Sequence, residues 1–233
     1  MIICHIGARS GSKGLKNKNI MNFYGKPLIA WTIEKVKKIK AIQKIIVSTD
    51  SLKIAEISKK YGAEVPFLRP KHLSGDKVSK FLVFKHSLKY LIKKYNFNNR
   101  DLFLDIDCTN PLIKKGDIIK IINLYLKKDK IDGIYTISEA NKNPYFNMVE
   151  YKKNGFLKLC KILKKKIIRR QDAPKVYSHV AGVYALSPNF IKNKNNLMDG
   201  NCLGYEVKTE YSFDIDNEHD LEIVKYFFKK NVI

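Results

Sequence analysis

The sequence predicts an α/β fold in which helices flank a mostly parallel β-sheet. Over residues 1–137, short apolar runs alternate with segments of helical periodicity, the order produced by parallel strands with right-handed crossovers. The run KIIVST at 44–49 is apolar, as expected of a parallel strand covered on both faces. A chain of 233 residues with 45% hydrophobic residues suits a single domain, residues 1–233.

Apolar runs mark the expected strands, and apolar residues spaced three and four apart mark the expected helices. The expected strands in this part of the chain are 2–7, 44–49, 64–68, 101–107 and 133–137. The expected helices are 27–39, 52–61, 77–95 and 117–127. The first helix has Pro27 in its first turn and an apolar face made of Ile29, Ile33, Val36 and Ile39. Either Asp50 or Ser51 is expected to cap the second helix.

The alternation lapses between residues 138 and 178. This stretch holds aromatic residues, prolines and a lysine run at 161–166, and it predicts a hairpin arm or a lid inserted within the domain. After it, VAGVYAL at 180–186 returns to a strand pattern. Residues 212–228 predict a strand followed by a helix whose inward face consists of Leu221, Val224 and Phe228.

The net charge of +23 is a feature of nucleic-acid-binding proteins, but the type of basic residue argues against that class. Only five of the 45 basic residues are arginines, and arginine makes most bidentate contacts to phosphates and bases. The lysines are spread through the expected helices, which is typical of solvated faces. We therefore expect no nucleic-acid partner, and a surface that attracts small polyanions.

We expect a cytoplasmic protein without a membrane partner. Met1 leads directly into IICHI, without the pattern of a signal peptide, and no apolar run approaches the roughly 20 residues of a membrane helix. The four cysteines are far apart, which predicts reduced thiols and neither a disulfide framework nor a zinc site; they are Cys4, Cys108, Cys160 and Cys202.

A glycine-rich basic loop, HIGARSGSKGLKNKN at 5–19, follows the first expected strand. It is neither a Walker A loop nor a Rossmann GxGxxG loop. Gly11 and Gly14 nevertheless let backbone N–H groups approach oxygens closely, and Arg9, Lys13 and Lys18 carry enough charge for a triphosphate. Because ligands bind beyond the carboxyl ends of parallel strands, we favour a phosphate-binding loop over the alternative of a surface turn with solvated lysines.

Asp214 and Asp216 stand two residues apart on an expected strand, so both carboxylates face the same way. Two hard oxygen ligands on one face suit Mg²⁺ or Mn²⁺. The alternative is that one of them caps the final helix, a role for which Asn217 is also available. Asp105 and Asp107 form a similar pair at the end of another expected strand.

The chain resembles the N-acylneuraminate (CMP-sialic acid) cytidylyltransferases, with relatives that activate Kdo, pseudaminic acid and legionaminic acid. The resemblance covers nearly the whole chain, in the family's order, through ARSGSKGLKNKN at 8–19 with GKPLI at 25–29, VSTD at 47–50, LRPKHLSGD at 68–76, NPLI at 110–113, RRQDAP at 169–174 and DIDNEHDL at 214–221. It implies a Rossmann-like nucleotidyltransferase fold with a protruding dimerisation arm, and therefore a homodimer. It also implies that CTP and a nine-carbon 2-keto sugar acid give the CMP-sugar and pyrophosphate, for surface glycan biosynthesis.

The resemblance also implies roles for individual residues. Those at the nucleotide would be Arg9, Ser12, Lys13, Asn19 and Arg69. Lys18 would complete the clamp on the phosphates together with Asn19, and it would also act in catalysis. Asp214 and Asp216 would bind the metal ion and act in catalysis, because the ion bridges the phosphates and a carboxylate can accept the proton of the attacking hydroxyl. Those at the sugar would be Asp107, Arg170 and Tyr184. Asp105 and Asp107 are left with three alternatives: sugar contact, a second metal ion, or capping of a loop.

Three departures from the family pattern concern the acceptor. Asp107 stands where the family often has glutamine, Ile113 where it has arginine, and Val180 where it has asparagine. Mismatched polar groups in a sugar site are costly, so the acceptor is expected to differ from plain sialic acid. IDCTNP together with NPYFNMVE at 143–150 favours the legionaminic-acid branch.

Two other functions remain as alternatives. The first is a nucleotidyltransferase that uses Kdo, or a sugar 1-phosphate with another NTP, and the second is a basic nucleic-acid-binding protein. His5 and His179 have no acid or base partner that the sequence identifies, so both are expected to be structural.

Overall fold

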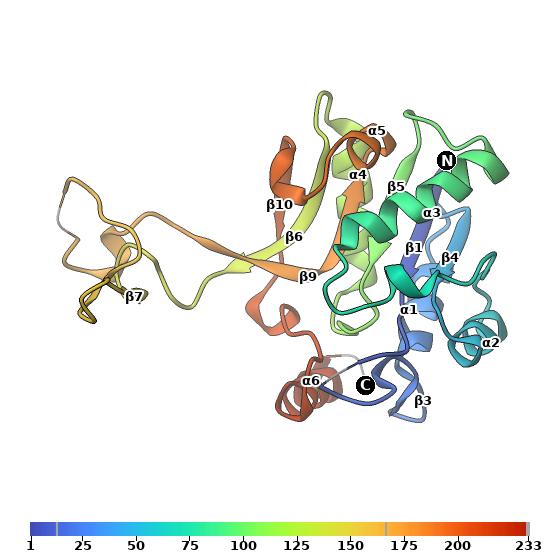
Figure 1. The fold of residues 1–233 in the computed structure, drawn as a ribbon, viewed down its shortest axis with the longest axis horizontal. Coiled ribbons are helices and arrows are strands. Elements are labelled where there is room, and N and C mark those ends of the chain that lie inside the picture. The colour runs from blue at the N-terminus through green and yellow to red at the C-terminus, as the bar shows by residue number, and fades with distance from the viewer. Residues whose placement is uncertain (13, 166, 232–233) are drawn as a thin grey trace.

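The computed structural model describes residues 1–12, 14–165 and 167–231, and its centre is a six-stranded β-sheet (Figure 1). The strands run in the order β10-β6-β9-β5-β1-β4. Their bounds are Ile2–Gly7 for β1, Lys44–Ser48 for β4, Leu102–Ile106 for β5, Gly133–Glu139 for β6, Tyr177–Leu186 for β9 and Cys202–Glu206 for β10. β1 is parallel to both β4 and β5, and β10 is parallel to β6, which confirms a largely parallel sheet.

β9 is the exception, because it runs antiparallel to both β5 and β6. The described residues between β6 and β9 form no crossover helix, so the chain leaves along β6 and returns along β9 as the two sides of one long hairpin. This hairpin is the base of the arm.

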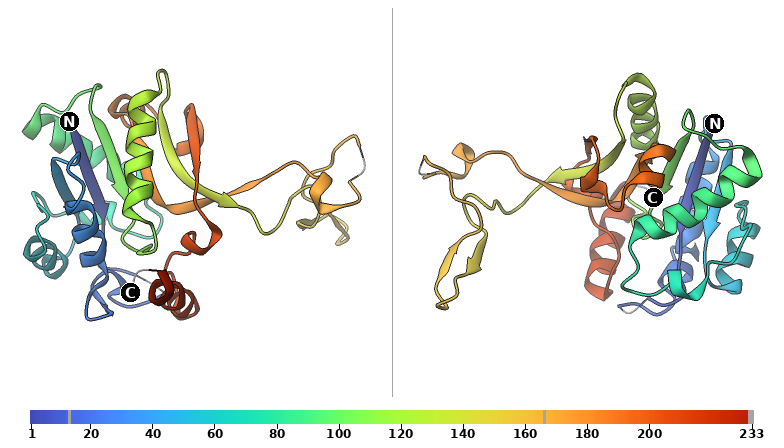
Figure 2. Two further views of the ribbon diagram at one scale, coloured as in Figure 1. Left: turned by 180° about the vertical axis from the view of Figure 1, so that it is seen from behind. Right: turned by 45° about the horizontal axis from the view of Figure 1, so that its top comes forward.

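Helices cover both faces of the sheet (Figure 2). Their bounds are Leu28–Lys37 for α1, Leu52–Lys60 for α2, Lys80–Tyr95 for α3, Lys115–Lys127 for α4, Pro188–Asn193 for α5 and Glu218–Asn231 for α6. One apolar cluster joins the sheet to α1, α2, α4 and α6, and the other joins it to α3 and α5. Burial of both faces explains why the central strands are apolar throughout.

The expected helical faces are confirmed. Ile29, Ile33 and Val36 of α1 are fully buried, and so are Val224 and Phe228 of α6. α2 is capped by Ser51, whose hydroxyl accepts a hydrogen bond from the backbone N–H of Ile54 at 3.3 Å.

Two expected strands are wrong. Residues 64–68 make only isolated parallel bridges, from Glu64 to Ile46 and from Leu68 to Thr49, because Pro66 between them has no N–H to donate. Residues 212–216 form no strand either. β10 and α5, by contrast, were not anticipated from the sequence.

The segment between β6 and β9 projects away from the globule as a long arm (Figures 1 and 2). Its tip carries a short antiparallel hairpin, β7 (Val149–Tyr151) and β8 (Leu157–Leu159). Apolar side chains on the arm are exposed, among them Val149, Tyr151, Phe156 and Leu157. Exposure of this much apolar surface is typical of a segment that packs against another chain. Within the described residues, no helix is both long and apolar enough to span a membrane.

Candidate active site

A cavity of about 530 Å³ lies at the carboxyl ends of β1 and β5. Four segments line it: the loop after β1, the segment from Arg69 to Phe84, the end of β5, and the acidic stretch before α6. Its polar lining includes Arg9, Ser12, Lys18, Asn19, Arg69, Lys80, Asp107 and Asp216. Segments from both ends of the chain therefore meet around one hollow.

The basic loop and the acidic stretch are in direct contact. The Lys18 Nζ donates to Asp216 Oδ1 at 2.7 Å, and the Lys18 side chain is only 11% exposed. The backbones also approach closely, since a Cβ on Gly14 would lie 2.0 Å from the carbonyl oxygen of Asp216. Only glycine permits that approach, so Gly14 is needed here for space.

Other contacts fix the course of the loop. Asn19 Nδ2 donates to the carbonyl oxygen of Arg9 at 2.9 Å, and the Arg9 guanidinium pairs with Asp76 at 2.5 Å. Asp50 accepts from the backbone N–H of Ser10 at 2.8 Å and from its hydroxyl at 2.7 Å, which ties the loop to the end of β4. Lys13, assigned to the nucleotide by resemblance, lies outside the described residues.

Arg69 is held rigidly at the back of the cavity. The residue is 7% exposed, its Nε donates to Ser48 Oγ at 3.1 Å, and its Nη2 donates to the Ser48 carbonyl oxygen. A guanidinium stays charged even when buried, so this arrangement keeps a fixed positive charge facing the cavity.

Asp214 and Asp216 lie on a segment without regular secondary structure, on either side of the fully buried Ile215. The backbone N–H of Ile215 donates to the carbonyl oxygen of Thr109 at 2.9 Å. This hydrogen bond to a loop stands where the sequence predicted pairing with a neighbouring strand.

The capping alternative for this pair does not hold. The N-terminus of α6 is capped by Asn217, whose Oδ1 accepts from the backbone N–H of Asp220 at 3.0 Å. The Asp220 carboxylate reaches back to the backbone N–H groups of Asp216 and Asn217, at 3.0 and 3.1 Å. The carboxylates of Asp214 and Asp216 are not used as caps, so they are available for chemistry.

Burial raises the pKa of Asp214 to about 6, and the charges of Asp216 and Asp107 add to the effect while Lys18 opposes it. Carboxylates close together disfavour each other's ionisation, and a bound cation would offset the repulsion between them. Within the described part of the chain, no three side chains of His, Cys, Asp or Glu form a metal-binding group. A cation at this pair would therefore need ligands from a substrate or water.

Without metal, the protein is expected to lose stability as the pH rises from about 4 to about 6 on account of Asp214. A carboxyl whose pKa is higher in the folded state favours folding while protonated, and that contribution disappears once the pH exceeds the folded-state pKa. Asp214→Asn mimics the protonated form. Its melting temperature, measured in EDTA, should match wild type near pH 4 and exceed it near pH 7. The exposed Asp129→Asn serves as the control, and a difference independent of pH would contradict this assignment.

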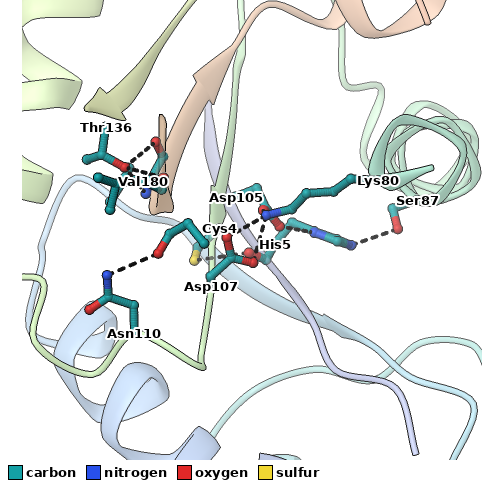
Figure 3. A network of polar contacts seen from close by, with 11 residues as sticks. Cys4, His5, Lys80, Ser87, Asp105, Asp107, Asn110, Thr136 and Val180 are labelled. Carbon is teal, nitrogen blue, oxygen red and sulfur yellow. Dashed lines mark hydrogen bonds and ion pairs between the residues drawn. The ribbon is translucent and has the colours of Figure 1, made fainter. Parts of the chain in front are cut away.

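A chain of polar contacts leads into the cavity from the protein interior (Figure 3). Ser87 Oγ lies 3.0 Å from His5 Nε2, and His5 Nδ1 lies 2.6 Å from Asp105 Oδ1. Lys80 Nζ then pairs with Asp105 Oδ2 at 2.8 Å and with both oxygens of Asp107 at 2.7 Å. The expectation that His5 lacks an acidic partner is therefore wrong, because β1 and β5 are neighbours in the sheet and Asp105 is paired in register with His5.

The two aspartates at the end of β5 have different environments. Asp105 is fully buried, and although burial alone raises its pKa, Lys80 and His5 lower it below the ordinary value. Asp107 lines the cavity with its side chain 18% exposed; burial, and to a lesser degree Asp105, raise its pKa while Lys80 opposes them. Asp105 thus supports Lys80, and only Asp107 of the pair presents a carboxylate to a ligand.

Lys80 was missed from the sequence, where it is one of many lysines. Tyr184 lies behind Lys80 and is 2% exposed, with the centre of its ring 3.8 Å from Lys80 Nζ. Tyr184 also lines an adjoining cavity of about 290 Å³.

Arg170 lies on the arm, where it lines a separate cavity of about 340 Å³ and its Nη2 is 3.5 Å from the Ala140 carbonyl oxygen. Within one chain, Arg170 therefore does not reach the site around Asp107.

Comparison with known proteins finds relatives along nearly the whole chain. Residues 3–231 match the cytidylyltransferase family. The chain is 34% identical over 229 residues to post-translational flagellin modification protein B of Campylobacter coli, covering 98% of this chain and 95% of that protein. It is also 34% identical over 226 residues to CMP-N,N'-diacetyllegionaminic acid synthase of Campylobacter jejuni, covering 97% and 94%.

A solved structure of CMP:2-keto-3-deoxy-manno-octonic acid synthetase complexed with CTP has the same fold, with a TM-score of 0.72 at 15% identity over 99% of both chains. The family match and the two relatives each span nearly the full length of the sequence. The chain belongs to the cytidylyltransferase family.

Proposed function

We propose that this protein transfers CMP from CTP to the anomeric hydroxyl of a nine-carbon 2-keto sugar acid and releases pyrophosphate. The observation that carries the proposal is the contact between the cationic loop and the aspartate pair, made by Lys18 and Asp216 across the mouth of one cavity. A triphosphate needs fixed cations, and the reacting phosphorus needs an attacking group held in line with the leaving pyrophosphate.

The cations of the cavity serve the triphosphate. Arg9 and Ser12 of the loop bind its outer phosphates together with Lys13, and the buried Arg69 holds the nucleotide from behind. Lys18 sits beside Asp216, so it neutralises charge at the reacting phosphate. Asn19 acts through the loop, because its amide holds the Arg9 backbone.

A divalent cation, Mg²⁺ or Mn²⁺, fits Asp214 and Asp216. Their carboxylates are hard oxygen ligands and are not used as helix caps, and the charge of Asp216 adds to the burial that raises the pKa of Asp214. When bound, the ion would neutralise the phosphates and acidify the attacking hydroxyl. The side chains themselves hold the nucleotide, and one carboxylate of the pair accepts the proton of that hydroxyl.

The acceptor occupies the side of the cavity formed by Asp107, with Tyr184 behind it. The similarity to CMP-N,N'-diacetyllegionaminic acid synthase supports a legionaminic-type acid. Arg170 can pair with the acceptor's carboxylate only if the arm of a second copy reaches this cavity. We therefore propose a homodimer held by the exposed apolar residues of the arm.

Pyrophosphate release with each NTP and a panel of acceptors tests this function. CTP with Mg²⁺ and a legionaminic-type acid is expected to give the highest kcat/KM, and Kdo or a sugar 1-phosphate with any NTP at least tenfold less, because hydrogen-bonding sites discriminate strongly. A higher kcat/KM with Kdo or a sugar 1-phosphate would establish the other nucleotidyltransferase. Absence of pyrophosphate with every pair, combined with salt-sensitive RNA binding, would favour a nucleic-acid-binding protein.

A further inference from the structure

Lys80 occupies a position where a cation is electrostatically unfavourable. It is the first residue of α3, whose first turn contains no acidic residue. The N-terminus of a helix carries a partial positive charge, so a lysine there is destabilising unless other groups offset it. Here the offset comes from the Asp105 and Asp107 carboxylates and from the face of the Tyr184 ring.

The support for Lys80 is rigid. Asp105, His5 and Ser87 are all fully buried, and their contacts of 2.6 and 3.0 Å continue the chain into α3 (Figure 3). His5 is further packed against the rings of Phe84 and Phe103. A fully connected buried network of this kind holds its members in one arrangement.

Asp107 is where this network meets the cavity. Its backbone is fixed by a hydrogen bond from its N–H to the Gly182 carbonyl oxygen at 2.9 Å. Lys80 can only donate hydrogen bonds, so both Asp107 oxygens act as acceptors toward it. The Tyr184 hydroxyl is a further partner of this carboxylate, whose side chain remains 18% exposed where it lines the cavity. A carboxylate held in this way attracts hydrogen-bond donors and repels phosphate and carboxylate oxygens.

We propose that Lys80 and Asp107 form the specificity-determining pair for the acceptor, with Asp107 accepting a hydrogen bond from a hydroxyl or amide N–H of the sugar acid and Lys80 as the positioning residue. The inference rests on the proposed function. It implies that the acceptor's own carboxylate faces away from Asp107. It also implies that an acceptor lacking the donor at that point is rejected.

Wild-type enzyme provides the first test. Analogues of the best acceptor in which one hydroxyl is replaced by fluorine, or one amide N–H is methylated, can accept but no longer donate at that point. One analogue is expected to lose about 10- to 100-fold in kcat/KM, the effect of losing a charge-assisted hydrogen bond. If no single replacement costs more than about threefold, the proposal is overturned, whether or not any variant folds.

Variants locate the effect. Asp107→Asn keeps the size of the side chain, and it is expected to raise the acceptor KM about tenfold or more while the KM for CTP stays within about twofold. In Asp107→Asn, the sensitive analogue and the parent acceptor should have similar kcat/KM values. The variant no longer accepts the hydrogen bond that the analogue cannot donate, so the second change has little further effect. Lys80→Met should raise the acceptor KM to a similar extent, and Lys80→Arg should bring the acceptor KM most of the way back to the wild-type value. The exposed Asp129→Asn is the matched control for charge removal.

The outcomes separate this inference from the proposed function. If wild type releases no pyrophosphate with any acid, the proposed function fails. The inference fails in either of two cases in which wild type is active. In the first, Asp107→Asn changes the KM values for CTP and for the acceptor together. In the second, the losses in kcat/KM caused by the analogue and by the substitution simply add, and the pairing of Lys80 and Asp107 then has no role in acceptor choice.

Discussion

Replacing Gly14 by alanine is expected to abolish most of the nucleotidyl transfer, while the same change at Gly11 in the same loop is expected to have little effect. The added Cβ at Gly14 would lie 2.0 Å from the backbone oxygen of Asp216, whereas nothing lies within 4 Å of one added at Gly11. Backbone atoms cannot move aside like a flexible side chain, so the loop and the acidic stretch must separate. A misplacement of about 1 Å at a reacting centre costs on the order of 100-fold in rate.

The measurement is kcat/KM for pyrophosphate release, together with the melting temperature with and without CTP and Mg²⁺. Gly14→Ala should also lower the free energy of unfolding by about 1–3 kcal/mol, the usual cost of overpacking. Gly11→Ala controls for the general loss of loop flexibility, because it changes the same residue type without a clash. Equal activities of the two variants would show that the contact between Gly14 and Asp216 does not organise the site.

Asp216→Asn is expected to lower kcat by about 100- to 1,000-fold while CTP binding changes by only a few-fold. The Asp216 side chain is 70% exposed and contacts Lys18 at 2.7 Å, so the amide fits without steric cost. Under the proposed function, the variant loses the charge that would hold a divalent cation and align Lys18 at the reacting phosphate, and this charge would matter most in the transition state.

Single-turnover kinetics and calorimetry of CTP binding distinguish the loss of turnover from a loss of affinity. The exposed Glu222→Gln on α6 serves as the control, since it removes one negative charge away from the cavity. Turnover near that of wild type at saturating Mg²⁺ would remove Asp216 from catalysis. A loss confined to the KM for CTP would instead make it a nucleotide-binding residue.

Much of the fold followed from local pattern. The apolar faces of α1 and α6 appear in the sequence as residues three and four apart, and the same spacing is buried in the structure. The order of strands and helices over residues 1–137 was also readable, apart from the strand expected at 64–68, because each element is a local arrangement. The strand expected at 64–68 failed because Pro66 has no N–H to donate, so only isolated bridges form beside β4.

The contact partners of individual side chains could not be predicted from the sequence in this way. Lys18 and Asp216 are 198 residues apart, and His5 and Asp105 are 100 apart. Lys80 is one of 45 basic residues, and nothing in its local sequence distinguishes it from a solvated lysine. Its contacts arise because β5 lies beside β1 and β9 in the sheet, so that Asp105, Asp107 and Tyr184 surround the first turn of α3. Periodicity along a chain indicates which face of a helix or strand is buried. Which side chain lies opposite that face depends on how the helices and strands are arranged in space, and local sequence does not contain that information.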